Sequence, residues 1–208
     1  VLEKKGFLLV DSGATYMDGT TDITRTYPLG PLTEDEKRFY TWTLQSHIDL
    51  AKAVWLDYCE CKMIDTIARE PLWRHLINYR CGTGHSVSFV GNVHEGPHSL
   101  RGTNSVLMRP GMVVTDEPGV YETDLVGIRI ENELVCVHKA DNQYGTFLGF
   151  EPLMFVPIAT SPILPGVLDK DEIAWLNDYH RQVFAKLAPH LNDEERSWLA
   201  EKCAAIGC

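Results

Sequence analysis

The 208-residue sequence lacks several features that would assign it to a large class of proteins. No run approaches the roughly 18 apolar residues that a membrane-spanning helix needs, and no signal-peptide pattern opens the chain. Basic residues are also in deficit, because 29 acidic residues outnumber 19 basic ones and give a net charge of -10. We therefore expect neither a membrane span nor nucleic-acid binding.

The cysteines lack the density and the regular spacing of a disulfide framework. With 44% hydrophobic residues, the chain can form a core without disulfides, so we expect free thiols and a cytoplasmic location. Cys59 and Cys61 are separated by a single residue, which is poor spacing for zinc and favours a helix-end pair. The six cysteines are Cys59, Cys61, Cys81, Cys136, Cys203 and Cys208.

The glycine-rich stretch 82–84 lacks the rest of a phosphate-binding motif, since neither a Lys-Ser/Thr pair nor a full GxGxxG is present. The loop around it contains three histidines, His85, His94 and His98. Histidines are common in flexible surface loops, but the apolar runs beside this loop indicate an ordered one. Glycine lets a backbone approach a ligand closely, so a ligand site is a reasonable interpretation.

The most informative stretch lies near the start of the chain. The apolar run 7–10 leads into Asp11, the pair Asp18-Gly19 is typical of a hairpin turn, and a second strand leads into Asp22. An antiparallel hairpin would place Asp11 and Asp22 side by side. Two carboxylates that close repel each other unless a proton or a cation lies between them. The alternative is a solvated hairpin with ordinary surface acids.

Periodic apolar residues and capping residues predict the remaining elements. Helices are expected after Thr33, over Met63–Glu70 with Pro71 ending or kinking the helix, after Asp169 and after Asn192. The last two carry apolar stripes that suit packing on the domain or a dimer contact. Further strands are expected at Ser105–Met108, Met112–Thr115, Gly127–Val137 and Phe150–Ile158.

The strands and the loop together deliver four carboxylates and one imidazole, from Asp11, Asp22, His85, Glu117 and Glu131. If these groups converge, their oxygen and nitrogen atoms suit two divalent ions such as Mn²⁺, Co²⁺ or Zn²⁺. Two ions roughly 3.5 to 4 Å apart can hold a bridging hydroxide that hydrolyses an amide. Spacing alone leaves open the alternative that these groups never converge.

The sequence resembles the M24, or pita-bread, metallopeptidase family, and within it the eukaryotic cytosolic-type Xaa-Pro aminopeptidases (aminopeptidase P). The resemblance spans nearly the whole chain through VDSGATYMDGTTDITRTY, GTGHSVSFVGNVHEGP, VTDEPGVYE, GIRIEN, FEPLMFVPI and WLNDYH. It implies an α+β pita-bread fold, an antiparallel sheet flanked by helices. Residues 1–160 would form a catalytic domain that lacks its first part, and residues 161–208 a C-terminal helical extension.

The resemblance also implies residue roles. Two divalent ions, most readily Mn²⁺, would be held by Asp11, Asp22, His85, Glu117 and Glu131. Glu117 would act as general base, His94 would stabilise the tetrahedral intermediate, and Arg129 would orient the carboxylates. The substrate, a peptide with proline in second position, would contact Cys81, His85, His94 and Glu117.

The chain departs from the family pattern at three positions. The family usually reads His-Gly-Thr-Gly-His-Gly-Val-Gly, and this chain has Cys81, Ser86 and Ser88 at three of those places. The missing first histidine lines the substrate pocket in relatives. The chain also begins at Val1, within what the resemblance implies is the catalytic domain, so we expect an upstream part carrying another active-site histidine and N-terminal domains.

Two alternatives accompany this interpretation. Another M24 peptidase, prolidase or methionine aminopeptidase, would share the site but cleave different substrates. A non-catalytic pita-bread module would bind proteins and would have lost its metal ligands, which the retained ligand types argue against. The expected partners are a peptide substrate, the upstream domains and a second copy in a homodimer.

Overall fold

A long β-hairpin opens the fold in the computed structural model, which describes residues 1–207. Strand β1 (Phe7–Tyr16) pairs antiparallel with β2 (Gly19–Pro28), which confirms the hairpin. Gly19 has a φ of 152°, in a region that favours glycine, so the turn depends on the residue that predicted it.

The register of the hairpin determines which side chains share a face. Asp11 lies opposite Thr24, and Gly13 lies opposite Asp22. Because residues two apart on a strand point to the same side, Asp11, Asp22 and Thr24 share one face. Asp11 and Asp22 are therefore diagonal neighbours and do not form a directly opposed pair.

The other strands form one larger sheet and two short antiparallel pairs. The larger sheet is antiparallel, in the order β3 (Val54–Leu56), β10 (Gly145–Pro152), β9 (Asn132–Asn142) and β6 (Val113–Asp116). The short pairs join β4 (Gly84–His85) to β5 (Ser99–Leu100), and β7 (Gly119–Glu122) to β8 (Val126–Arg129).

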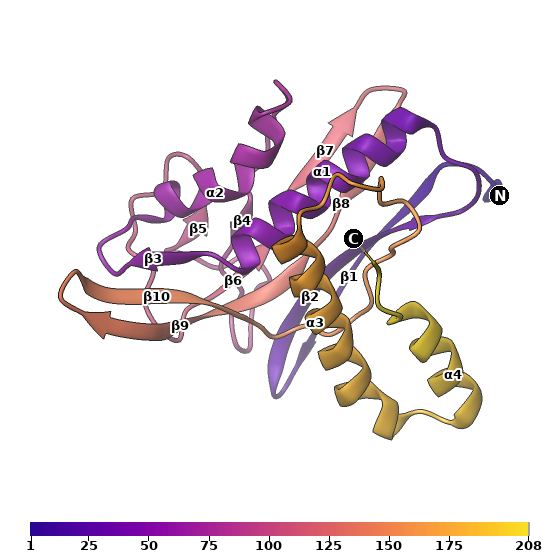
Figure 1. Ribbon diagram of the computed structural model, residues 1–208. Coiled ribbons are helices and arrows are strands. Elements are labelled where there is room, and N and C mark those ends of the chain that lie inside the picture. Colours follow the sequence, from indigo (N-terminus) through magenta and orange to yellow (C-terminus); the bar gives the residue numbers. More distant parts are fainter. Residues whose placement is uncertain (208) are drawn as a thin grey trace.

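The helices begin where the capping residues predict. Thr33 and Asp169 each form a capping box, at the start of α1 (Glu34–Ala51) and α3 (Lys170–Leu187). Asn192 does the same for α4 (Asp193–Lys202), which follows the 3₁₀ turn η1 (Ala188–His190). Figure 1 shows α1 and α2 (Cys61–Trp73) above the main sheet, with α3 and α4 projecting at the lower right.

Pro71 lies in the last turn of α2, and the helix continues to Trp73, so the expected end near Glu70 falls within three residues of the observed one. Two other local predictions were wrong. Ser105–Met108 is not a strand, since it contributes only an isolated bridge at Leu107. The strand expected over Gly127–Val137 is interrupted between β8 and β9, at Ile130 and Glu131.

The apolar run predicted as a last strand at Phe150–Ile158 leaves the sheet after Pro152. This segment packs against helix α3 instead. The Phe155 ring stacks on Tyr179 with centroids 6.3 Å apart, and the Ile158 N–H donates to His180 Nε2 at 3.1 Å. The run is apolar because it packs under a helix, which a strand pattern cannot distinguish from sheet pairing.

Helix α3 packs on the rest of the fold with its apolar stripe. Leu176, Tyr179 and Val183 are buried in one cluster with residues of α1 and with Ile128 and Ile130. Packing on the domain, one of the two roles expected for this stripe, is observed, and the dimer contact stays a prediction.

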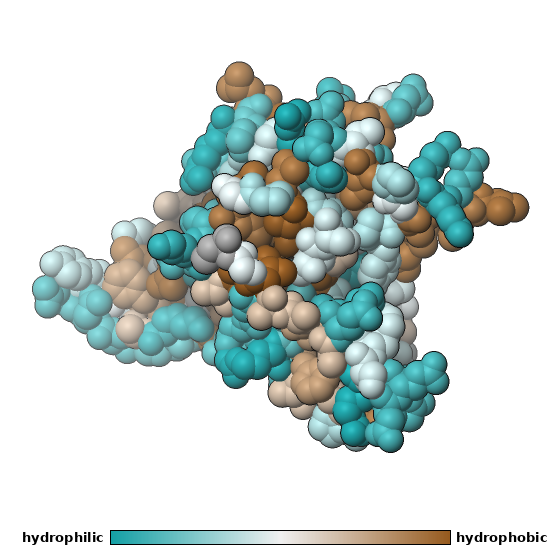
Figure 2. Space-filling model, turned by 45° about the vertical axis from the view of Figure 1, so that its right-hand side comes forward, coloured by the Kyte–Doolittle hydropathy of each residue, from teal (hydrophilic) through white to brown (hydrophobic). Residues whose placement is uncertain are grey.

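Figure 2 shows one face of the molecule as mostly hydrophilic around a hydrophobic area near its centre. None of the described helices is long and apolar enough to cross a membrane.

The pH dependence of the unfolding free energy should reveal the protonation of the buried His180. Burial, and next the charge of Arg25, lower the pKa of His180 to about 4. The unfolded chain takes up this proton near pH 6.5, so the stability that neutral His180 provides is present above that pH and is lost as the pH falls toward 4. In chemical denaturation, the unfolding free energy of the unaltered chain should fall relative to His180→Gln across this window. A constant difference between the two would contradict this assignment.

Candidate metal centre

Strand β4 places His85 opposite the hairpin. Gly84 allows this approach, because a Cβ atom there would lie 1.8 Å from the Thr115 carbonyl oxygen. The His85 N–H donates to Thr115 Oγ1 at 3.0 Å, which fixes the backbone of the histidine. His85 Nδ1 lies 3.2 Å from the Ser86 carbonyl oxygen, so Nε2 is the nitrogen turned toward the acids.

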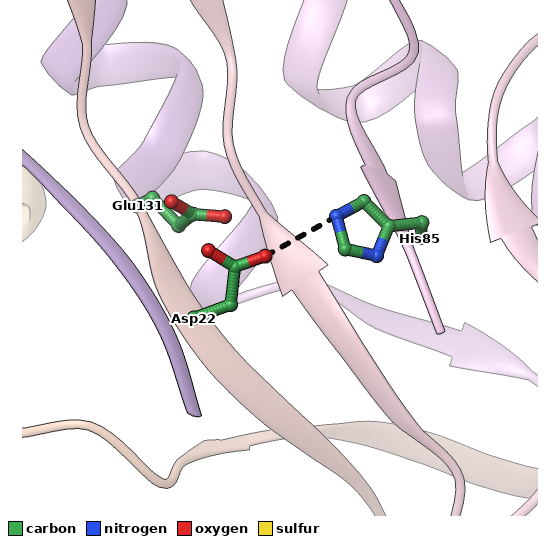
Figure 3. A group of neighbouring side chains, drawn as sticks. All are labelled: Asp22, His85 and Glu131. Atoms are coloured by element: carbon green, nitrogen blue, oxygen red, sulfur yellow. Dashed lines mark ion pairs between the residues drawn. The ribbon is translucent and has the colours of Figure 1, made fainter. Parts of the chain in front are cut away.

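Carboxylates surround His85 Nε2. The nitrogen lies 3.4 Å from Asp22 Oδ2, the contact drawn in Figure 3, and 3.2 Å from Glu117 Oε1. Thr115 Oγ1 lies 3.1 Å from Glu117 Oε1, within donor distance. Burial opposes protonation of His85, but the hydrogen bonds to Asp22 and Glu117 prevail and raise its pKa to about 10. These acids favour a positive charge at this point.

Glu131 is the most deeply buried acid of the group, with 1% of its surface exposed. It lies in the break between β8 and β9, and its Oε2 accepts a hydrogen bond from Thr24 Oγ1 at 2.6 Å. Within residues 1–207, nothing hydrogen-bonds its Oε1. Burial, followed by the charges of Glu117 and Asp22, raises the pKa of Glu131 to about 8.

Asp11 is turned toward an arginine. Arg129 Nη2 donates to Asp11 Oδ2, Nη1 donates to the Tyr121 hydroxyl at 2.6 Å, and Nε lies 3.8 Å from Glu117 Oε2. Half of the Asp11 side chain is exposed. Arg129 therefore bridges Asp11 and Glu117 at the edge of the site.

A cavity of about 610 Å³ joins these groups. The predicted site residues that line it are Asp11, Asp22, His85, His94, Glu117 and Glu131. The His94 and His85 rings lie with centroids 4.1 Å apart in an edge-to-face arrangement. Cys81 is exposed and does not belong to the described lining of this cavity, although its carbonyl oxygen accepts from Arg69 Nη2 at 2.8 Å. The structure thus brings the acids and both histidines together, with Cys81 outside.

The residues present fit a divalent cation. Asp22, His85 and Glu131 each offer a ligand atom, and these three atoms lie within 4.8 Å of one another (Figure 3). A buried carboxylate oxygen without a protein partner, next to two further acids and an imidazole, is a donor set for a first-row divalent ion. Glu117 and Asp11 adjoin this group and could complete a second position.

The sequence analysis missed residues that support the site. Thr24 and Thr115 place hydroxyls against Glu131 and Glu117, and both side chains are fully buried. Strand periodicity could have identified Thr24, because it shares a face with Asp22. Glu133 is 5% exposed, and burial raises its pKa to about 7, with the Asp22 charge adding to the effect. Apart from the strand pattern, nothing in the sequence indicates that Glu133 is a second buried acid near the site.

Comparison with known proteins matches both parts of the chain to one peptidase family. Residues 1–138 match Metallopeptidase family M24, and residues 146–206 match the C-terminal region of peptidase M24. Aminopeptidase P1 of Lotus japonicus is 42% identical over 212 residues, covering 99% of this chain and 32% of that protein. Aminopeptidase P2 of Arabidopsis thaliana is 43% identical over 205 residues, covering 95% and 29%. The chain spans about a third of the length of these relatives.

Solved structures share the fold. The X-prolyl aminopeptidase of Caenorhabditis elegans, described as a cytosolic enzyme with a di-nuclear active site, superposes with a TM-score of 0.89. It is 39% identical, over 95% of this chain and 33% of that one. A prolidase from Pyrococcus furiosus has a TM-score of 0.60 at 29% identity, over 72% and 41%. The expected α+β pita-bread fold is confirmed.

Replacing Glu131 by glutamine should remove a pH-dependent cost of folding. The folded pKa of about 8 exceeds the unfolded value of 4.5, so the unaltered chain loses stability as pH rises between these values. With metal removed by a chelator, the unfolding free energy of Glu131→Gln should therefore exceed that of the unaltered chain. The difference should grow from pH 5 to about 8. The matched control is Glu151→Gln, an exposed acid on β10. A difference that does not vary with pH would contradict the assignment.

Proposed function

This chain belongs to metallopeptidase family M24, and on that premise we propose that it carries the metal centre of an Xaa-Pro aminopeptidase. The proposed reaction releases the first residue from a peptide with proline in second position. The observation that carries the proposal is the Asp22, His85 and Glu131 cluster, with its unpartnered buried oxygen, in the wall of a cavity.

Two divalent ions are proposed to bind here, held by Asp11, Asp22, His85, Glu117 and Glu131. When bound, such ions supply Lewis-acid activation of water and of the scissile carbonyl at neutral pH. Mn²⁺ is the proposed metal, because carboxylate oxygens with a single imidazole suit it. Support comes from the donor set described above and from the di-nuclear active site of the C. elegans relative.

The chain's own residues would move the proton. Glu117 is proposed to take a proton from the attacking water and to return it to the proline nitrogen as the peptide bond breaks. Thr115 holds Glu117 Oε1 in place, which leaves Oε2 toward Arg129 and the cavity. Arg129 would orient Asp11 and Glu117 through the contacts described above.

The histidines and the acids would orient the substrate. His94 is proposed to donate a hydrogen bond to the carbonyl oxygen as negative charge develops there. It lies on the cavity wall beside His85, and the two rings form an edge-to-face pair with centroids 4.1 Å apart. The excess of acids around the cavity favours the free ammonium group at the N-terminus of a peptide.

Among M24 activities, an aminopeptidase is favoured over a prolidase. The X-prolyl aminopeptidase from C. elegans matches 95% of this chain at 39% identity, whereas the P. furiosus prolidase matches 72% at 29%. The C. elegans protein is described as cytosolic, which supports a cytoplasmic location here. The homodimer and the division at residue 160 stay predictions.

The direct test is peptide hydrolysis by the 208-residue chain, alone and together with the upstream part that the resemblance implies. With Mn²⁺ present, we expect release of the first residue from an Xaa-Pro-Yaa tripeptide, followed by liquid chromatography, and loss of this activity in a chelator. The matched control peptide has alanine in place of proline. Elemental analysis of the same samples gives the metal content per chain.

Three results would contradict the proposal in different ways. Cleavage of Xaa-Pro dipeptides alone would indicate a prolidase. Bound metal without cleavage of any peptide, even with the expected upstream part present, would favour a non-catalytic module. Absence of metal would remove the metal centre itself.

Glu117→Gln should separate binding from proton transfer. An amide cannot accept the proton, so kcat for the Xaa-Pro peptide should fall about 10² to 10⁴-fold while KM changes little. The matched control is Glu122→Gln, an exposed acid at the end of β7. Metal content is measured for both variants, because Glu117 is also a proposed ligand. An unchanged kcat would show that another group moves the proton.

A further inference from the structure

A buried arginine lies directly behind the candidate metal centre. Arg25 follows Thr24 on β2, and only 3% of its surface is exposed. A guanidinium keeps its charge in proteins and carries five N–H donors, so its burial is costly unless those donors are satisfied. The partners of Arg25 therefore indicate what its burial achieves.

One end of the guanidinium holds the backbone of the site. Arg25 Nη1 donates to the Thr24 carbonyl oxygen at 2.9 Å and to the Glu131 carbonyl oxygen at 2.5 Å. The Glu131 N–H donates to the same Thr24 carbonyl at 3.1 Å. The side chains of Thr24 and Glu131 hydrogen-bond at 2.6 Å on the cavity side. Arg25 thus fixes the backbone that carries this side-chain pair.

The other end reaches the C-terminal part of the chain. Arg25 Nη2 donates to Asn132 Oδ1 at 2.8 Å, to the Val156 carbonyl oxygen at 2.7 Å and to the Tyr179 hydroxyl at 2.9 Å. Arg25 Nε donates to the Pro157 carbonyl oxygen at 3.1 Å. Across residues 1–207, the hydrogen bonds of this guanidinium all go to neutral oxygens. Its planar fork therefore acts through geometry, by holding several oxygens at once.

Tyr179 is itself rigidly held. It is 2% exposed on α3, and its ring stacks on Trp175 with centroids 5.4 Å apart and planes 3° from parallel. Its hydroxyl also accepts from the Val156 N–H at 3.2 Å. A rigid hydroxyl on a packed helix gives the guanidinium a fixed anchor.

We propose that Arg25 is a positioning residue for the metal centre, which links Tyr179 of α3 to the backbone of the metal ligand Glu131. Its planar fork holds Glu131 and Thr24 in register, so that the Glu131 carboxylate keeps its aim into the cavity. The inference rests on the metal centre proposed above. It makes α3 part of the support of that centre in addition to its role in packing.

The test measures metal binding as well as stability. The probe is Co²⁺ alone, titrated into the 208-residue chain, with visible absorption reporting affinity and ligand geometry. Arg25→Lys keeps the charge but replaces the fork by one ammonium, so Co²⁺ affinity should fall about 10-fold or more, with an altered absorption spectrum. Tyr179→Phe removes only the hydroxyl anchor and keeps the ring stacking, so it should give a smaller loss in the same direction.

The matched control is Gln45→Leu. Gln45 is also buried and also ties α1 to α3, through Nε2 and Glu172 Oε1 at 3.0 Å, but it does not contact the candidate site. It should lower the unfolding free energy and leave Co²⁺ affinity unchanged. Folded Arg25→Lys or Tyr179→Phe chains that bind Co²⁺ as the unaltered chain does would overturn the inference alone. Absence of Co²⁺ binding by the unaltered chain would overturn the metal centre as well.

Discussion

The crowding of acids around His85 is the constraint on which the site depends. Asp22 and Glu117 contact the same imidazole nitrogen, and the buried Glu131 lies beside them with an oxygen that no residue in 1–207 hydrogen-bonds. Burial, and next the charges of Glu117 and Asp22, raise the pKa of Glu131, while hydrogen bonds to Asp22 and Glu117 raise the pKa of His85 against the opposing effect of burial. A proton compensates the negative charge of these acids only partly, whereas a divalent ion brings more charge and binds several of their oxygens at once.

Neutral hydroxyls and one arginine keep these acids in place. Thr24 and Thr115 bind one oxygen each of Glu131 and Glu117, so the other oxygen keeps a fixed direction. Arg129 holds Asp11 at the edge of the cavity through a contact that is partly exposed. The acids therefore range from the buried Glu131, through the partly buried Glu117, to the half-exposed Asp11.

The C-terminal helix is joined to this centre by polar contacts as well as apolar ones. Tyr179 and His180 accept hydrogen bonds from the segment that leaves β10, and Tyr179 also accepts from Arg25. The core cluster that contains Tyr179 extends across α1 and β8. Helix α3 therefore shares a core with the strands that carry the proposed metal ligands.

The sequence by itself determined the local elements, because their signals are local. Asp18-Gly19 specifies the hairpin, and the capping boxes specify where the helices begin. The tertiary structure decided what each group faces. Asp11 turns to Arg129, the run after Pro152 packs under α3, and Arg25 is buried behind the site. The contacts of Asp11 with Arg129 and of Arg25 with Val156 join residues more than 100 positions apart. The packing under α3 joins residues 22 to 24 positions apart, and neither periodicity nor capping encodes any of these contacts.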